Sequence, residues 1–256
     1  MKRSIAISGW AWVATALALA STSALALPSS AVFSYSGQPG APADVRLEVV
    51  TNTGTYQING SLRGWVAADG SNLGADPANN YIAGLCGSSD SCGGDDVELR
   101  NWFAFSLVTT AFTSIASASL LLDVPDPGSG NQGVYVSALG NPTYTLWDVT
   151  QPTGNFTGGT AGLAEYNDLG SGTSYGSRVY SLADQGNTTI IPLNAAAVAF
   201  LNGNLQNTVI LGGAVTPIPT PQAAATIPVP ATSSATLVLV AALLVLVAFT
   251  ALRRRG

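Results

Sequence analysis

The stretch Val97-Glu98-Leu99-Arg100-Asn101-Trp102-Phe103-Ala104-Phe105-Ser106-Leu107 decides the fold class. Its odd-numbered residues are apolar apart from Asn101, and its even-numbered residues are polar or smaller apart from Trp102. Successive side chains of a β-strand point to opposite faces, so a period of two predicts a half-buried strand.

Similar runs continue on both sides of this stretch, separated by clusters of Gly, Pro, Asn and Asp such as residues 126–131. They predict nine or ten short strands and therefore an all-β fold, an antiparallel β-sandwich of jelly-roll type. One short helix is expected over residues 194–202, where Asn194 is placed to cap an alanine-rich run. The other predicted strands cover residues 45–50, 55–58, 61–66, 116–124, 133–136, 144–149, 178–182, 188–193 and 208–211.

The N-terminal residues 1–26 have the features of a secretory signal peptide. Lys2 and Arg3 precede a long apolar stretch, and Ala24-Leu25-Ala26 offers signal peptidase a cleavage site between Ala26 and Leu27. An uncleaved N-terminal anchor is the alternative. The folded part is expected to span residues 27–216.

The C-terminal part has the features of a linker followed by a membrane segment. Residues 217–234 are rich in Pro, Ala and Thr, a composition typical of an extended spacer. Residues 235–252 then carry no charge and, at about 1.5 Å per residue, form a helix of about 27 Å, close to the thickness of a bilayer core. The arginines in the tail 253–256 mark its cytoplasmic side, which predicts that the domain faces outward.

The charges exclude several classes of function. Between the two terminal segments, four arginines stand against all 14 acidic residues, a formal charge of −10, which disfavours nucleic-acid binding. The chain has no His, and its one Lys lies in the leader, so His-dependent catalysis, imidazole zinc sites and Schiff-base chemistry are excluded. Carboxylate, hydroxyl and carbonyl groups remain for chemistry.

Cys86 and Cys92 are separated by five small or polar residues. Because disulfides persist outside the cytoplasm, an exported chain is expected to join them. A redox-active pair is the alternative, although the spacing is not that of a Cys-x-x-Cys motif.

Four carboxylates lie within nine residues beside these cysteines: Asp90, Asp95, Asp96 and Glu98. Oxygen donors on a glycine-rich loop suit a structural Ca²⁺ ion, and no other cofactor is expected. A solvated acidic loop is the alternative, with Glu98 pointing to solvent from its strand. A pair of carboxylates catalysing glycoside hydrolysis is a further alternative, but no spacing singles out a pair.

The aromatic residues divide into core and surface candidates. Trp102 and Trp147 lie in alternating strands and are expected to be buried or half-buried. Tyr166 and Tyr175 lie among glycines and serines, so we expect them to be exposed and able to stack on a sugar ring.

The C-terminal region resembles the PEP-CTERM class of sorting signals. The resemblance rests on Ile227-Pro228-Val229-Pro230, the hydrophobic segment and the final arginine cluster. It implies an exosortase-type transpeptidase as a partner, processing near Pro228, Val229 and Pro230, and a Gram-negative host that makes exopolysaccharide. The usual Glu is absent, because Ala231 and Thr232 follow Pro230.

Segments between residues 95 and 214 are similar to secreted β-sandwich domains carried by such proteins, among them Arg100–Phe105 and Asp168–Gly176. The sequence therefore predicts a non-enzymatic protein of the cell surface or exopolysaccharide matrix. We expect the hydrophobic helix to hold it in the inner membrane at least transiently. A carbohydrate-binding module, stabilised by calcium or not, is the second hypothesis, and a polysaccharide-acting enzyme is the third.

Overall fold

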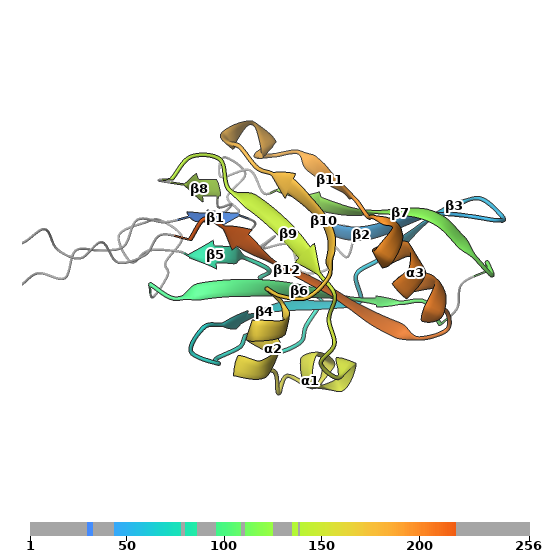
Figure 1. Ribbon diagram of the computed structural model, residues 1–256, viewed down its shortest axis with the longest axis horizontal. Coiled ribbons are helices and arrows are strands. Elements are labelled where there is room, and N and C mark those ends of the chain that lie inside the picture. Colours follow the sequence, from blue (N-terminus) through green and yellow to red (C-terminus); the bar gives the residue numbers. More distant parts are fainter. Residues whose placement is uncertain are drawn as a thin grey trace, which may run out of the picture.

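The computed structural model describes residues 30–32, 44–77, 80–85, 96–108, 111–124, 135–137 and 139–218. These residues form two antiparallel β-sheets that pack against each other, with short helices at their margins (Figure 1). The predicted all-β antiparallel sandwich is therefore confirmed.

The smaller sheet has the strand order β11-β7-β2-β3. In β2, Val45, Leu47 and Val49 are buried, and the residues between them are more exposed, as alternation requires. The strand β3 lies at the edge and has no buried residue. The bounds are β2 Val45–Thr51, β3 Thr55–Asn59, β7 Ile115–Asp123 and β11 Thr188–Pro192.

The larger sheet has the order β10-β9-β12-β6-β5-β1-β8, and β4 also pairs with β6. The strand β12, the last one among the described residues, therefore lies between β6 and β9, and it pairs with both. The bounds are β1 Ser30–Val32, β4 Leu62–Ala67, β5 Ala83–Leu85, β6 Glu98–Ser106, β8 Tyr135–Ser137, β9 Thr143–Trp147, β10 Ser174–Val179 and β12 Thr208–Thr216.

Several strands differ from the sequence prediction, among them β12, which was expected to end at Leu211 and continues to Thr216. The three-residue strands β1 and β5 were not predicted, because so short a run shows no alternation. The strand expected over residues 178–182 is instead β10, which begins at Ser174 and ends at Val179.

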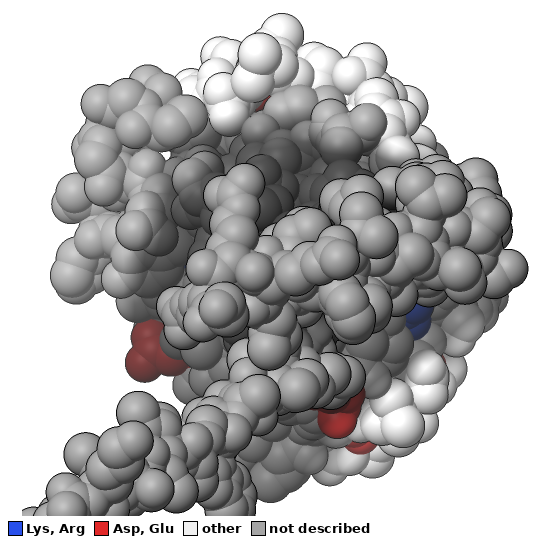
Figure 2. Space-filling model, turned by 90° about the vertical axis from the view of Figure 1, so that its left-hand side faces the viewer, with Lys and Arg blue, Asp and Glu red and all other residues white. Residues whose placement is uncertain are grey.

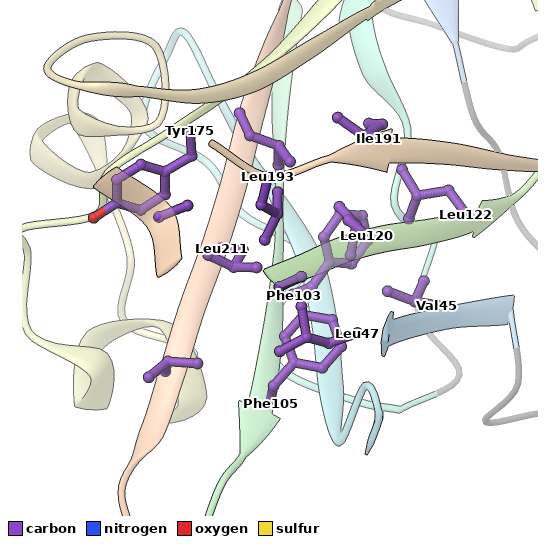
Figure 3. Close-up of a cluster of buried hydrophobic side chains, with 14 of the residues drawn as sticks. Val45, Leu47, Phe103, Phe105, Leu120, Leu122, Tyr175, Ile191, Leu193 and Leu211 are labelled. Atoms are coloured by element: carbon purple, nitrogen blue, oxygen red, sulfur yellow. The ribbon is translucent and has the colours of Figure 1, made fainter. Parts of the chain in front are cut away.

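The core lies between the two sheets. The side chains of Leu47, Leu120 and Ile191 from the smaller sheet meet those of Phe103 and Leu211 from the larger one (Figure 3). All five are fully buried. Truncating such a leucine or isoleucine to alanine typically costs about 2–5 kcal/mol of stability, so this contact holds the two layers together.

The predicted helix is present as α3, Ala195–Gly203, which connects β11 to β12. Oδ1 of Asn194 accepts a hydrogen bond of 3.1 Å from the backbone N–H of Ala197, which confirms the expected cap. Ala197 and Leu201 bury one side of this helix against the core.

The prediction of only one helix is wrong, because the structure also has α1, Thr153–Thr157, α2, Leu163–Asp168, and the 3-10 helix η3, Leu182–Asp184. The first two cover part of the outer face of the larger sheet, where Phe156 and Leu169 pack against Trp102 and Ile210. These helices are too short to show a helical period in the sequence.

The predicted signal peptide, most of the linker, the apolar segment 235–252 and the arginine tail lie outside the described residues. Across the described ranges, none of the helices has both the length and the apolar character needed to cross a bilayer.

Candidate functional site

A groove opens on the outer face of the larger sheet, where β12 and β6 separate. The two strands pair only as far as Gly213 and Asn101, after which β12 continues beside β9 and the start of β6 pairs with β5. The groove has a volume of about 250 Å³. It is lined by Glu98, Arg100, Thr145, Trp147, Gly170, Ala214, Val215, Thr216 and Ile218.

The strand alternation decides which side chains face the groove. In β9, Tyr144 and Leu146 are buried in the core, so Thr145 and Trp147 point to the outer face, and both are half-buried. In β12, Val215 belongs to the core and Ala214 lies on the outer face. Ala214 carries only a methyl group, so β12 forms the floor of the groove. The larger side chains of β9 and β6 form its walls.

A fixed ion pair forms one wall. Nε of Arg100 donates a hydrogen bond of 2.9 Å to Oε1 of Glu98, and Nη1 donates one of 2.9 Å to the carbonyl oxygen of Tyr166. The guanidinium carbon lies 4.0 Å from the centroid of the Tyr166 ring. A Cβ at Gly170 would overlap with the guanidinium group. Arg100 is therefore held in one position before any ligand arrives.

The hydroxyl of Tyr166, a buried residue that does not itself line the groove, hydrogen-bonds to Glu98. Burial raises the pKa of Tyr166, the negative charge of Glu98 raises it further, and Arg100 acts in the opposite direction. The tyrosine consequently stays a neutral donor across the physiological range.

The expected exposure of the two tyrosines is wrong. Tyr166 is 7% exposed, because it lies in α2 with its ring under Arg100. Tyr175 is 5% exposed and belongs to the core, where its ring centroid lies 5.5 Å from that of Phe200 (Figure 3). Burial, and then the charge of Asp148, raise the pKa of Tyr175 to about 12. Both rings are buried against protein side chains, so neither offers an exposed face on which a sugar could stack.

The acidic segment is only partly described. Asp90, Asp95, Cys86 and Cys92 lie outside the described residues, so the calcium site and the disulfide stay predictions. Asp96 has a φ of 59°, in the left-handed region, and Glu98 is half-buried in its ion pair rather than pointing freely to solvent. Among the residues with described positions, no three carboxylate, Cys or His groups converge as metal ligands.

Each of the four arginines of the folded part has an acidic partner. Beside Arg100–Glu98, the ion pairs are Arg46–Asp123 at 3.1 Å, Arg63–Asp44 at 3.3 Å and Arg178–Asp184 at 2.7 Å. Figure 2 shows acidic side chains of described residues at several separate places on one end of the molecule. The arginines therefore form ion pairs within the fold, and the surplus of acidic residues makes the surface negatively charged.

The sequence did not single out Arg100, Thr145 or Trp147 as groove residues. Their alternation places them correctly on strands, but it cannot tell which face of a sheet a helix leaves open. The pairing that brings β9 beside β12 joins residues about 70 positions apart, and no local pattern carries that information.

The sequence was also compared with models of known protein families and with curated proteins. Neither comparison gives a match for this chain.

Proposed function

We propose that this chain is a non-enzymatic exported protein of the cell surface or exopolysaccharide matrix, sorted or anchored through its C-terminal apolar segment. The observation that carries the proposal is the order of its parts: a leader at 1–26, a proline-rich linker at 217–234, an apolar run at 235–252 and terminal arginines. The fold supports it, because β12 ends at Thr216, immediately before the linker.

Three carboxyl groups, those of Asp69, Glu165 and Asp184, have the character of structural rather than acid-donating groups. A glycosidase needs a carboxylic acid whose pKa is raised, so that it can donate a proton. Burial acts to raise the pKa of both Glu165 and Asp184, but hydrogen bonds outweigh it and lower both pKa values. In Asp69, hydrogen bonds from Ser71 lower the pKa. These three groups serve as hydrogen-bond acceptors in the fold.

We also propose that the two sheets are connected as in a jelly roll. The support for this is that the chain passes from one sheet to the other between β6 and β7, between β10 and β11, and between β11 and β12. Such crossings are typical of Greek-key arrangements.

The test is the intact mass and location of the protein in its native host. We expect a species without residues 1–26 that ends near Pro230 and is found outside the inner membrane. Replacing Pro228 and Pro230 by alanine should leave the full-length C-terminus in the membrane, whereas the same change at Pro219 and Pro221 should not. A wild-type protein that keeps residues 235–252 in the membrane would show anchoring without sorting.

A second function is supported by the groove. We propose that the domain binds carbohydrate there, because a half-buried indole beside a fixed ion pair and a threonine hydroxyl offers both an apolar surface and hydrogen bonds. A glycan array probed with the full chain, with and without a chelator, tests this function. Binding that the chelator abolishes would show dependence on calcium. If no glycan binds either with or without the chelator, the carbohydrate hypothesis is wrong.

A further inference from the structure

We propose that the groove takes one ring of a neutral polysaccharide, stacked on Trp147 and held by hydrogen bonds to the Glu98–Arg100 pair. This inference rests on the carbohydrate-binding function proposed above and adds the chemical class of the ligand.

The apolar wall is the indole of Trp147. This side chain points to the outer face from the last residue of β9 and lines the groove. A sugar ring carries C–H groups on its faces and hydroxyls around its edge, so it matches a flat aromatic surface with polar groups beside it. Tyr166, Tyr175 and Trp102 are buried and cannot serve in this way.

The polar wall is the ion pair on β6. Glu98 and Arg100 are both partly accessible, with side chains 19% and 18% exposed, and both line the groove. A carboxylate accepts and a guanidinium donates hydrogen bonds, so together they match two neighbouring hydroxyl groups. The contacts of Arg100 with Tyr166 and Gly170 fix the pair in advance, which lowers the entropy cost of binding.

The charge favours a neutral ligand over a uronate. The positive charge of Arg100 is already balanced by Glu98 and engaged by the carbonyl oxygens of Tyr166 and Asn167. The remaining arginines of the domain are paired as well, and the acidic residues are in excess. A carboxylate in the groove would therefore meet no uncompensated positive charge.

The size favours a single ring. The groove's volume of about 250 Å³ is below the ~300 Å³ at which pockets for drug-sized molecules begin. The groove is only partly enclosed, so the rest of a polymer can continue over the surface. A polymer would be held at one ring per domain, and its affinity would come from several domains acting together.

The experiment is a calorimetric titration of the full chain, purified in a detergent without a sugar headgroup. The probes are neutral glucose and mannose hexasaccharides and, for comparison, an alginate hexasaccharide. We expect binding of a neutral probe with an affinity that does not change between about 0.05 and 0.5 M NaCl, because a neutral ligand is not screened. The alginate probe should not bind.

Variants test the location. Trp147→Ala should weaken binding of the neutral probe about tenfold or more, which corresponds to about 1.4 kcal/mol. Thr145→Val should also weaken it, while Thr143→Val, on the same face of β9 but outside the groove, should not. Melting curves of the three variants establish that each is folded. Glu98→Gln should weaken neutral binding and create binding of alginate, because it leaves Arg100 with uncompensated charge.

The outcomes separate the two proposals. Alginate binding by the wild type that is lost in Trp147→Ala would keep the carbohydrate site and overturn the neutral ligand. Neutral binding that Trp147→Ala leaves unchanged would overturn the groove as its location. If no probe binds, both the carbohydrate function and the inference fail, while the proposal of export and sorting stands on its own test.

Discussion

The hydroxyl of Tyr144 on β9 donates a hydrogen bond of 2.6 Å to Oδ1 of Asn101 on β6, passing over β12, which separates these strands. Asn101 is fully buried, and its Nδ2 donates to the carbonyl oxygen of Tyr81 at 2.8 Å. The hydroxyl of Tyr81 in turn donates to the carbonyl oxygen of Asp123 on β7. This chain of hydrogen bonds connects the larger sheet to the smaller one across the core.

Tyr144→Phe should destabilise the domain by about 1–3 kcal/mol, because Oδ1 of Asn101 would remain buried without this donor. Denaturation in urea, followed by circular dichroism, measures the loss. The control is Tyr56→Phe, because Tyr56 is a half-buried tyrosine near the surface. Thr145→Phe would not serve as a control, because its ring would fill the groove. A loss no larger than that of Tyr56→Phe would mean that the buried bond contributes little.

Gly213→Ala should be more damaging than most glycine substitutions. A Cβ at this position would lie 2.6 Å from Cζ of Tyr144, because the tyrosine ring crosses the strand at this point. We expect a loss of about 1–3 kcal/mol, the usual cost of overpacking a core. Gly203→Ala is the matched control, since nothing lies within 4 Å of its Cβ position and the residue ends α3. Equal melting temperatures for the two variants would contradict this prediction.

Glu165 should make the stability of the domain dependent on acid pH. Its Oε1 accepts from Nδ2 of Asn155 and its Oε2 from the N–H of Gly162, both at 2.7 Å, so that it joins α1 to α2. Burial acts to raise its pKa, but these bonds outweigh it and hold the pKa below the usual value of 4.5. The unfolded chain therefore binds this proton at higher pH than the folded one.

The stability from Glu165 is consequently complete above the usual value and declines as pH falls toward the lowered pKa. Glu165→Gln should cost about 1–3 kcal/mol near neutral pH, and the difference from wild type should narrow at about pH 3. Melting temperatures of both proteins at the two pH values provide the measurement. A difference that widens in acid would show that the pKa is raised instead.

Gln206→Gly should stabilise the domain. Gln206 is exposed and has a φ of 71°, in the left-handed region, which costs a residue with a Cβ about 1 kcal/mol. Glycine avoids this cost but adds freedom to the unfolded chain, so we expect a net gain of about 0.5 kcal/mol. Gln185→Gly, at a φ of −59°, relieves no strain and should lower stability. Urea midpoints of the two variants should move in opposite directions.

The strand pattern of the sequence predicted much of the fold. The alternation in residues 97–107 identified β6, and Asn194 marked the start of α3, because both signals are local. The bounds of β10 were missed, since Gly176 and the serines around it resemble a loop although they pair with β9. Pairing over a long distance can make a strand of residues whose own preference is weak.

The site was harder to predict for the same reason. Tyr166 lies among small residues that indicate an exposed loop, yet it is covered by Arg100, which lies 66 positions earlier in the chain. Trp147 was expected to be buried or half-buried, and it is half-buried. Its role in the groove depends on β12 separating from β6, which is a property of the whole sheet.

The central place of β12 also has a consequence for the order in which the chain can fold. Synthesis supplies residues 208–216 after every other strand that the structure describes, so β6 and β9 lack their shared neighbour until that point. The strands β9 and β10 join the rest of the large sheet only through these late, long-range contacts, which form slowly. A chain whose final strand completes its sheet stays open while it is being made. That property would suit the export proposed above, in which the chain crosses a membrane before it folds.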